Sequence, residues 1–367
     1  MAERPSGKTT FDVLNGLRGI AAIAVVNMHM STYFGVIHSA NVAPAVDFFF
    51  VLSGFVISYA YEEKLTSGML WSRFFIARII RLYPLYLIGL ILGSIVVWFL
   101  EHPINPERFF ATLGLNLFML PNPVAMDANT TPLFPINFPA WSLFVELVAN
   151  LAYAALAPRL SNRLLTVIVC AGFLGLVATG MTTGTLDEGT QRLQILGGLA
   201  RVTFSFFAGV ALYRQWRVRP TNINLHPALL FVLLILPLML KPAAPFGWLY
   251  ELAVLTLYMP AIVWLGSGSR PIGVWLSVSV ALGALSYPLY MIHAPVWIAI
   301  RTLEGWQPTS VLIGYAPWSG IAMTAGLCAV AWWLDKAIDY PLRRRLYKTF
   351  LHRLTHAADP EVERQRR

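Results

Sequence analysis

Long apolar runs alternate along the chain with shorter polar segments. A helix needs about 20 apolar residues to cross the hydrocarbon core of a bilayer. The pattern therefore predicts an all-α polytopic membrane protein with about ten transmembrane helices. The predicted spans are residues 13–34, 43–60, 82–100, 141–157, 164–181, 194–213, 226–240, 248–266, 275–300 and 311–334.

The segment between the third and fourth predicted spans has a different pattern. Its apolar run, Arg108 to Leu120, is too short to cross a bilayer and predicts an interfacial or re-entrant helix. The following sequence, PNPVAMDANTTPLFPINFPA, is rich in proline and asparagine, which is typical of a long structured loop.

Composition agrees with a membrane protein and explains the net charge. Of the 367 residues, 57% are hydrophobic and 12% are charged, whereas soluble domains carry about 25% charged residues. If the N-terminus is inside, 21 of the 27 Lys and Arg residues lie in inner segments and 4 in outer loops. The positive-inside rule then predicts that both termini are cytoplasmic. The net charge of +9 does not indicate a nucleic-acid partner, because this rule already accounts for it.

The same pattern divides the chain into three parts. Residues 1–12 form a predicted cytoplasmic N-terminus, residues 13–334 the transmembrane domain, and residues 335–367 a basic cytoplasmic tail. The arginine run at 343–345 in this tail is assigned to attraction by lipid headgroups.

Two ionisable residues, Arg18 and His29, lie within the first predicted span. Their separation corresponds to about 16 Å along one helix face. Ionisable groups in hydrocarbon are costly and usually face a protein interior or a water-filled cavity. The pattern alone leaves two interpretations open: a functional path along this face, or a snorkelling arginine and a packed histidine.

Four titratable groups on four different spans are predicted to lie at a similar depth in the outer half of the membrane. These groups are His29, Asp47, Glu146 and His293. Their convergence predicts a polar cavity that opens outward. A histidine near a carboxylate is suited to general-base chemistry on a hydroxyl, but the same groups would also suit the proton relay of a transporter.

Arginines cluster on the inner side, just before the third predicted span. Arg78 and Arg81 are three residues apart and would share a helix face. With Arg18 they could form a cationic pocket for a phosphorylated ligand, because guanidinium groups match phosphate oxygens. The alternative is a simple positive-inside anchor, which the spacing alone favours.

Five segments in this order resemble the signatures of the acyltransferase-3 family of integral membrane acyltransferases. They are LNGLRGIAAIAVVNMH, VDFFFVLSGFVIS, RFFIARIIRLYPLY, WSLFVE and SYPLYMIH. The resemblance covers residues 13–300 and, with the last span, nearly the whole membrane domain. It implies a ten-helix domain that transfers an acyl group, usually acetyl from acetyl-CoA, to a carbohydrate.

The resemblance also implies roles for matching residues, whereas Asp47 is a candidate from its depth alone. The candidate catalytic residues are His29, Glu146, Asp47 and His293. The candidate donor-binding residues are Arg18, Arg78, Arg81 and Arg201. The family more often has aspartate where this chain has Asn15, which puts any role of a carboxylate there in doubt. No metal ion is expected, and Ser53 is expected to be a small packing residue.

The expected reaction is acyl transfer from cytoplasmic acetyl-CoA to a hydroxyl of an exopolysaccharide, O-antigen or other glycan or glycolipid, at the outer side of a bacterial inner membrane. The expected partners are acyl-CoA, a carbohydrate or glycolipid acceptor and membrane lipids. The acyl length, the use of a covalent intermediate and the oligomeric state stay open. The alternative is a proton-coupled transporter or flippase, although the sequence lacks paired broken helices in two matching halves.

Overall fold

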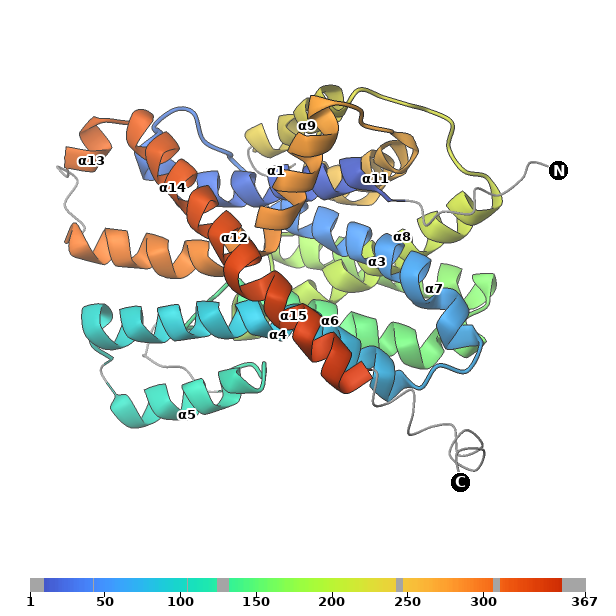
Figure 1. Ribbon diagram of the computed structural model, residues 1–367, viewed down its shortest axis with the longest axis horizontal. Coiled ribbons are helices and arrows are strands. Elements are labelled where there is room, and N and C mark those ends of the chain that lie inside the picture. Colours follow the sequence, from blue (N-terminus) through green and yellow to red (C-terminus); the bar gives the residue numbers. More distant parts are fainter. Residues whose placement is uncertain are drawn as a thin grey trace.

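The computed structural model describes residues 10–41, 43–103, 105–123, 132–241, 247–305 and 311–351. Within these ranges the chain is helical, without strands, and has one isolated bridge between Pro132 and Gln191. The α-helices (Figure 1) are α1 (Asp12–His29), α2 (Ser31–Phe34), α3 (Ala43–Thr66), α4 (Trp71–Val96), α5 (Pro106–Leu117), α6 (Ala140–Leu156), α7 (Asn162–Thr183), α8 (Ile195–Val218), α9 (Pro227–Ile235), α10 (Gly247–Ala253), α11 (Met259–Gly268), α12 (Val274–Leu303), α13 (Val311–Gly314), α14 (Trp318–Leu334) and α15 (Tyr340–Leu346).

Eight helical stretches in the described residues are long and apolar enough to cross a membrane. They are Ala43–Thr66, Trp71–Glu101, Ala140–Arg159, Asn162–Thr183, Arg192–Val218, Gly247–Gly268, Val274–Leu303 and Trp318–Phe350. The other two predicted spans correspond to α1, which contains Asp12 and Arg18, and to the shorter apolar helix Pro227–Met239. The prediction of an all-α polytopic membrane protein is confirmed, and the cytoplasmic placement of the termini stays a prediction.

Two helix ends differ from the prediction. The helix that carries the inner arginines begins at Trp71 rather than at residue 82, so Arg78 and Arg81 lie inside α4 and not in a preceding loop. The last span continues past residue 334 through a π-helical turn, Asp335–Asp339, and α15. Both predicted ends coincide with the first charged residues, which are typical of loops. Arginine is nevertheless a good helix former, and charged residues at both ends form ion pairs within the fold, as Arg81 does with Asp339.

The segment between α4 and α6 begins with the predicted short helix. α5 has 12 residues, and the side chain of Asn105 accepts a hydrogen bond from the backbone N–H of Arg108 at its start. Tyr83 of α4 donates a hydrogen bond to the carbonyl of Leu117, 2.9 Å away, so α5 is tied to α4. Residues 124–131 of the predicted proline-rich loop lie outside the described residues.

Glycines allow two helix pairs to pack closely in the centre of the bundle. A Cβ on Gly19 of α1 would lie 2.4 Å from the carbonyl oxygen of Leu282 in α12. A Cβ on Gly54 of α3 would meet the carbonyl of Phe206 in α8 at 1.9 Å. Small residues let membrane helices approach in this way. These contacts fix the positions of α1, α3 and α12, which carry most of the candidate site.

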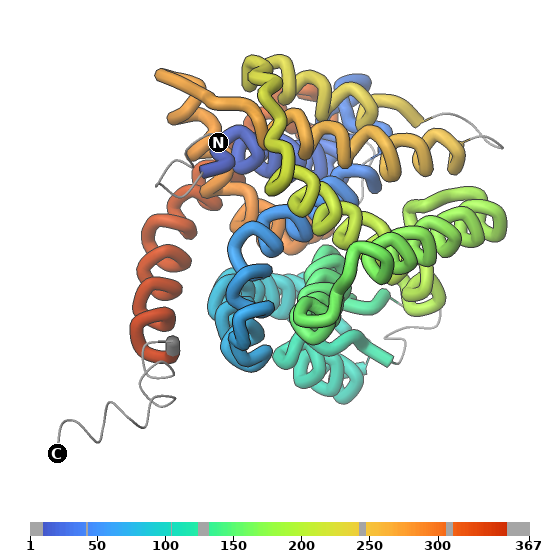
Figure 2. The backbone as a smooth tube through the Cα atoms, turned by 90° about the vertical axis from the view of Figure 1, so that its right-hand side faces the viewer, coloured from blue at the N-terminus to red at the C-terminus, as the bar shows by residue number. Residues whose placement is uncertain are grey.

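α12 contains two internal prolines, Pro288 and Pro295. Proline removes a backbone donor and kinks a helix, and Figure 1 shows that α12 changes direction near its middle. The C-terminal helix, α14 to α15, runs diagonally across the bundle in Figure 1 and lies at its edge in the view of Figure 2.

Candidate active site

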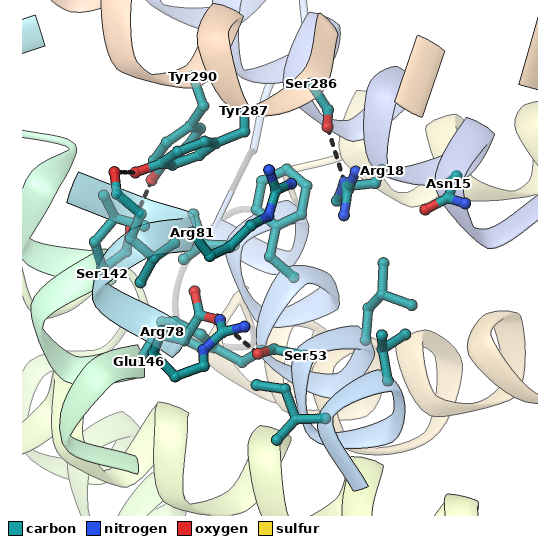
Figure 3. A pocket seen from close by; sticks show the side chains of 18 residues that line it. Asn15, Arg18, Ser53, Arg78, Arg81, Ser142, Glu146, Ser286, Tyr287 and Tyr290 are labelled. Carbon is teal, nitrogen blue, oxygen red and sulfur yellow. Dashed lines mark hydrogen bonds and ion pairs between the residues drawn. The ribbon is translucent and has the colours of Figure 1, made fainter. Parts of the chain in front are cut away.

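A cavity of about 200 Å³ lies among α1, α3, α4, α6 and α12. Its wall combines apolar side chains, such as Phe49 and Leu52, with ten polar residues (Figure 3). The polar residues are Asn15, Arg18, Ser53, Arg78, Arg81, Ser142, Glu146, Ser286, Tyr287 and Tyr290. These five helices are far apart in sequence, so the cavity exists only in the folded bundle.

Three arginines and one glutamate give this cavity a positive charge. Arg18 comes from α1, Arg78 and Arg81 from one face of α4, and Glu146 from α6. Nη2 of Arg78 lies 3.4 Å from Oε1 of Glu146. The sequence predicted that these arginines meet, and the structure does bring them together. The excess of guanidinium groups favours an anionic ligand.

Arg18 is held in the cavity wall by α12. Its Nε donates to Oγ of Ser286 at 2.8 Å, and its Nη2 donates to the carbonyl of Gly283 at 2.9 Å. Two directed hydrogen bonds to one helix fix the plane of a guanidinium group. Arg18 therefore faces the protein interior, and the snorkelling interpretation is wrong.

Ser53 has a polar partner that the sequence did not reveal. Its Oγ donates to Oε1 of Glu146 at 2.6 Å, so this carboxylate oxygen faces both Ser53 and Arg78. Ser53 therefore has a role beyond the expected packing, because it lines the cavity and hydrogen-bonds Glu146. No motif marks it, because a serine beside a glycine in an apolar helix is also typical of helix packing.

The two candidate histidines form a separate group next to this cavity. The ring centroids of His29 and His293 are 5.1 Å apart. Phe138 lies 5.1 Å and Trp297 6.0 Å from the ring of His29. The predicted convergence of the two histidines is therefore present in the structure, within a surround of aromatic rings.

Backbone carbonyls favour one neutral tautomer of each imidazole ring. Nδ1 of His29 lies 2.9 Å from the carbonyl oxygen of Val25, and Nδ1 of His293 lies 2.8 Å from that of Tyr290. A carbonyl only accepts, so each Nδ1 carries the proton and each Nε2 presents a lone pair. Nε2 of His293 is buried and has no hydrogen-bond partner among the described residues. The pair thus offers basic nitrogens in an otherwise apolar setting.

Tyr290 connects the cavity to the histidines. Its hydroxyl lies 2.8 Å from Oγ of Ser142 in the cavity wall, and its ring centroid is 5.7 Å from that of His293. Tyr290 therefore lines the arginine-lined cavity and also contacts His293 of the histidine pair.

Asp47 and Arg201 lie elsewhere, which corrects two of the predicted placements. They form an ion pair at 3.0 Å, with side chains that are each 1% exposed. Arg201 also donates to the carbonyls of Glu188 and Ala43, both at 2.8 Å, and its guanidinium lies over the ring of Trp141. A buried charge is stable only when it is paired and hydrogen-bonded. This pair therefore ties α8 to α3, and neither residue lines the cavity.

The predicted cluster of four titratable groups is thus divided among three places. His29 and His293 form a pair, Glu146 joins the arginines, and Asp47 joins Arg201. Depth in the membrane was predicted from position along each helix, but the direction in which a side chain points depends on the rotation of its helix. No cluster of three or more metal-ligating side chains occurs in the described residues.

Comparison with known proteins agrees with this architecture. The sequence model of the acyltransferase-3 family, described as an acyltransferase domain, matches residues 11–336. The chain is similar to protein 2 in the picA locus of Rhizobium radiobacter, with 40% identity over 174 residues, which is 44% of this chain and 89% of that protein. It is also similar to acyltransferase MdmB of Streptomyces mycarofaciens, with 28% identity over 155 residues, 38% of this chain and 37% of MdmB. No solved structure matches significantly. Because the family match covers most of the chain, this multi-pass membrane protein belongs to the acyltransferase-3 family and is an acyltransferase.

Proposed function

We propose that the protein transfers an acetyl group from acetyl-CoA to a hydroxyl of a carbohydrate or glycolipid at the outer side of a bacterial cytoplasmic membrane. The observation that carries the proposal is the contact between a cavity with three arginines and a pair of histidines, through Tyr290. Family membership supports acyl transfer over the alternative of a transporter.

In this proposal the phosphates of the donor bind Arg18, Arg78 and Arg81. CoA carries several phosphate oxygens, and guanidinium groups bind such oxygens through paired hydrogen bonds. Arg18 lies in the first half of α1 and His29 at its C-terminal end, about 16 Å apart by helix geometry. The pantetheine arm would cover this distance and place the thioester near the histidines.

His29 is the proposed general base, because it is only partly buried, whereas His293 is 0% exposed. Nε2 of His29 would take the proton of the acceptor hydroxyl while the oxygen attacks the thioester carbonyl carbon. A C–O bond forms, the C–S bond breaks, and the CoA thiolate receives the proton from the imidazolium. We assign His293 to positioning the ring of His29, which it contacts from the buried side.

Glu146 and Asp47 receive different roles from those that their depth suggested. Glu146 contacts Arg78 and Ser53, so we assign it to the orientation of Arg78 in the donor site. Asp47 is paired with Arg201 and is assigned to the stability of the bundle. Catalysis in this proposal therefore relies on the histidine pair.

Aromatic side chains beside the base support a sugar acceptor. Phe138 and Trp297 lie 6.2 Å apart, ring centroid to ring centroid, and both adjoin His29. Rings of this kind pack well against the apolar face of a pyranose, because they combine a large contact area with few rotatable bonds. An acceptor hydroxyl held there would lie next to the proposed base.

The test is acetyl transfer by purified protein in lipid nanodiscs. Radiolabelled acetyl-CoA is incubated with a panel of glycan and glycolipid acceptors, and both free thiol and labelled acceptor are measured. His29→Ala is expected to lower turnover by about 10²–10⁴-fold, the usual contribution of a general base. His102→Asn is the control, since His102 is exposed and has a left-handed backbone that asparagine tolerates.

Two results would overturn different parts of the proposal. If no acceptor in the panel releases thiol from acetyl-CoA, the proposed donor and acceptor classes are wrong. If His29→Ala retains full turnover, only its role as the base is wrong.

A further inference from the structure

A row of alternating charges leads from the donor cavity to the C-terminal helix. Nη1 of Arg81 lies 3.7 Å from Oδ2 of Asp339. The same Oδ2 lies 2.7 Å from Nη2 of Arg343, which lies 3.6 Å from Oδ1 of Asp335. The side chain of Asp339 is 1% exposed, so its charge is buried between two guanidinium groups.

Local helix geometry places Asp339 at this point. Asp335 and Asp339 are the first and last residues of the π-helical turn between α14 and α15. Beyond the turn, the hydroxyl of Tyr347 donates to the carbonyl of Ala77 at 3.1 Å. Ala77 and Arg81 are one turn apart on α4, so the C-terminal helix covers the face of α4 that bears Arg81.

An aromatic ring also lies near Arg81. Its guanidinium carbon lies 5.7 Å from the ring centroid of Tyr287, a residue of the cavity wall. The guanidinium group thus lies near both Tyr287 and Asp339. In the same region Arg18, Arg78 and Arg343 repel it, and without a carboxylate beside it Arg81 would move away from these charges.

We propose that Asp339 is a positioning residue for donor binding. By balancing the charge of Arg81, it keeps this guanidinium at the cavity, and the C-terminal helix is therefore part of the donor site. Asp339 lies beyond residue 336, where the family match ends, so the inference comes from the contacts of this chain. It rests on the proposed use of acetyl-CoA.

The experiment compares two donors that differ in their phosphates. Wild type, Asp339→Asn and the control Asp335→Asn are assayed with acetyl-CoA and with S-acetylpantetheine, which carries no phosphate. Asp335 lies on the same turn and contacts Lys336 and Arg343 instead of Arg81, so it is a matched control.

Asp339→Asn is expected to raise KM for acetyl-CoA by about tenfold, since coupled charges in one network contribute energies of this size. Its kcat with acetyl-CoA, and kcat/KM for S-acetylpantetheine, are expected to stay as in wild type. Asp335→Asn is expected to change KM by no more than about twofold. Asp339→Glu keeps the charge one methylene further out and is expected to restore most of the loss.

Each remaining result has a distinct meaning. An unchanged or lowered KM of Asp339→Asn for acetyl-CoA overturns the inference, because the carboxylate would then be irrelevant or would compete with the donor. An equal loss with both donors also overturns it, since that marks a structural role. If Asp339→Asn cannot be purified folded, Asp339→Glu decides, and a kcat/KM that falls equally for both donors counts against the inference. A wild-type enzyme that does not prefer acetyl-CoA over S-acetylpantetheine would instead contradict the proposed donor site.

Discussion

Replacing Arg201 by methionine removes the positive half of the most deeply buried ion pair described above. The carboxylate of Asp47, 3.0 Å from Nη2, would lose its cation, and the carbonyls of Glu188 and Ala43 would each lose a donor at 2.8 Å. Breaking a buried pair in this way costs about 3–5 kcal/mol, because one charge stays in the interior unpaired. The bundle is expected to lose that much unfolding free energy.

The assay is reversible unfolding in mixed detergent micelles, run as a double-mutant cycle. The double variant Asp47→Leu with Arg201→Met is expected to lie within about 2 kcal/mol of wild type, since an apolar pair of similar volume has no charge left to solvate. Arg192→Met, at an exposed position, is the control and is expected to cost under about 1 kcal/mol.

The reasoning would be refuted by an Arg201→Met variant as stable as wild type. A stable variant with a selectively raised KM for acetyl-CoA would instead support the donor-binding role that the sequence suggested for Arg201. A double variant no more stable than Arg201→Met would show that the unpaired carboxylate is not the source of the loss.

Two further substitutions test the packing and the wall of the cavity. Ser53→Ala removes the 2.6 Å hydrogen bond to Glu146 and is expected to raise KM for acetyl-CoA by about threefold, with kcat unchanged, as steady-state kinetics would show. A threefold fall in kcat alone would contradict a role in donor binding. Gly19→Ala places a Cβ 2.4 Å from the carbonyl of Leu282 and is expected to lower the unfolding free energy by about 1–3 kcal/mol. Gly114→Ala, where a Cβ meets nothing within 4 Å, is its control, and equal losses in the two variants would show that close packing is not the cause.

The sequence predicted the long apolar helices well because the length of an apolar run relates directly to bilayer thickness. The sequence misplaced the start of α4 and the end of the last helix, because charged residues at these two ends are typical of loops. In the structure these charges are internal to the fold, as with Arg81 and Asp339, and no local pattern reveals a partner that is distant in sequence.

The grouping of Arg18 with Arg78 and Arg81 could be predicted because all three lie toward the end of the bundle predicted to be cytoplasmic. The separation of Glu146 from His29 could not be predicted from the sequence. Position along a helix gives depth, whereas the direction of a side chain across the membrane plane depends on how each helix is rotated against its neighbours.

The bend in α12 has a thermodynamic consequence. Ser286, which holds Arg18, precedes Pro288, and His293 follows it. A single bent helix therefore contributes to both the proposed donor cavity and the histidine pair. A change in the bend that accompanied donor binding and moved the histidines would alter the free energy of acceptor binding. Linkage then requires that the acceptor change the affinity for the donor by the same factor. The coupling would be visible as equal shifts in the two dissociation constants, whichever substrate binds first.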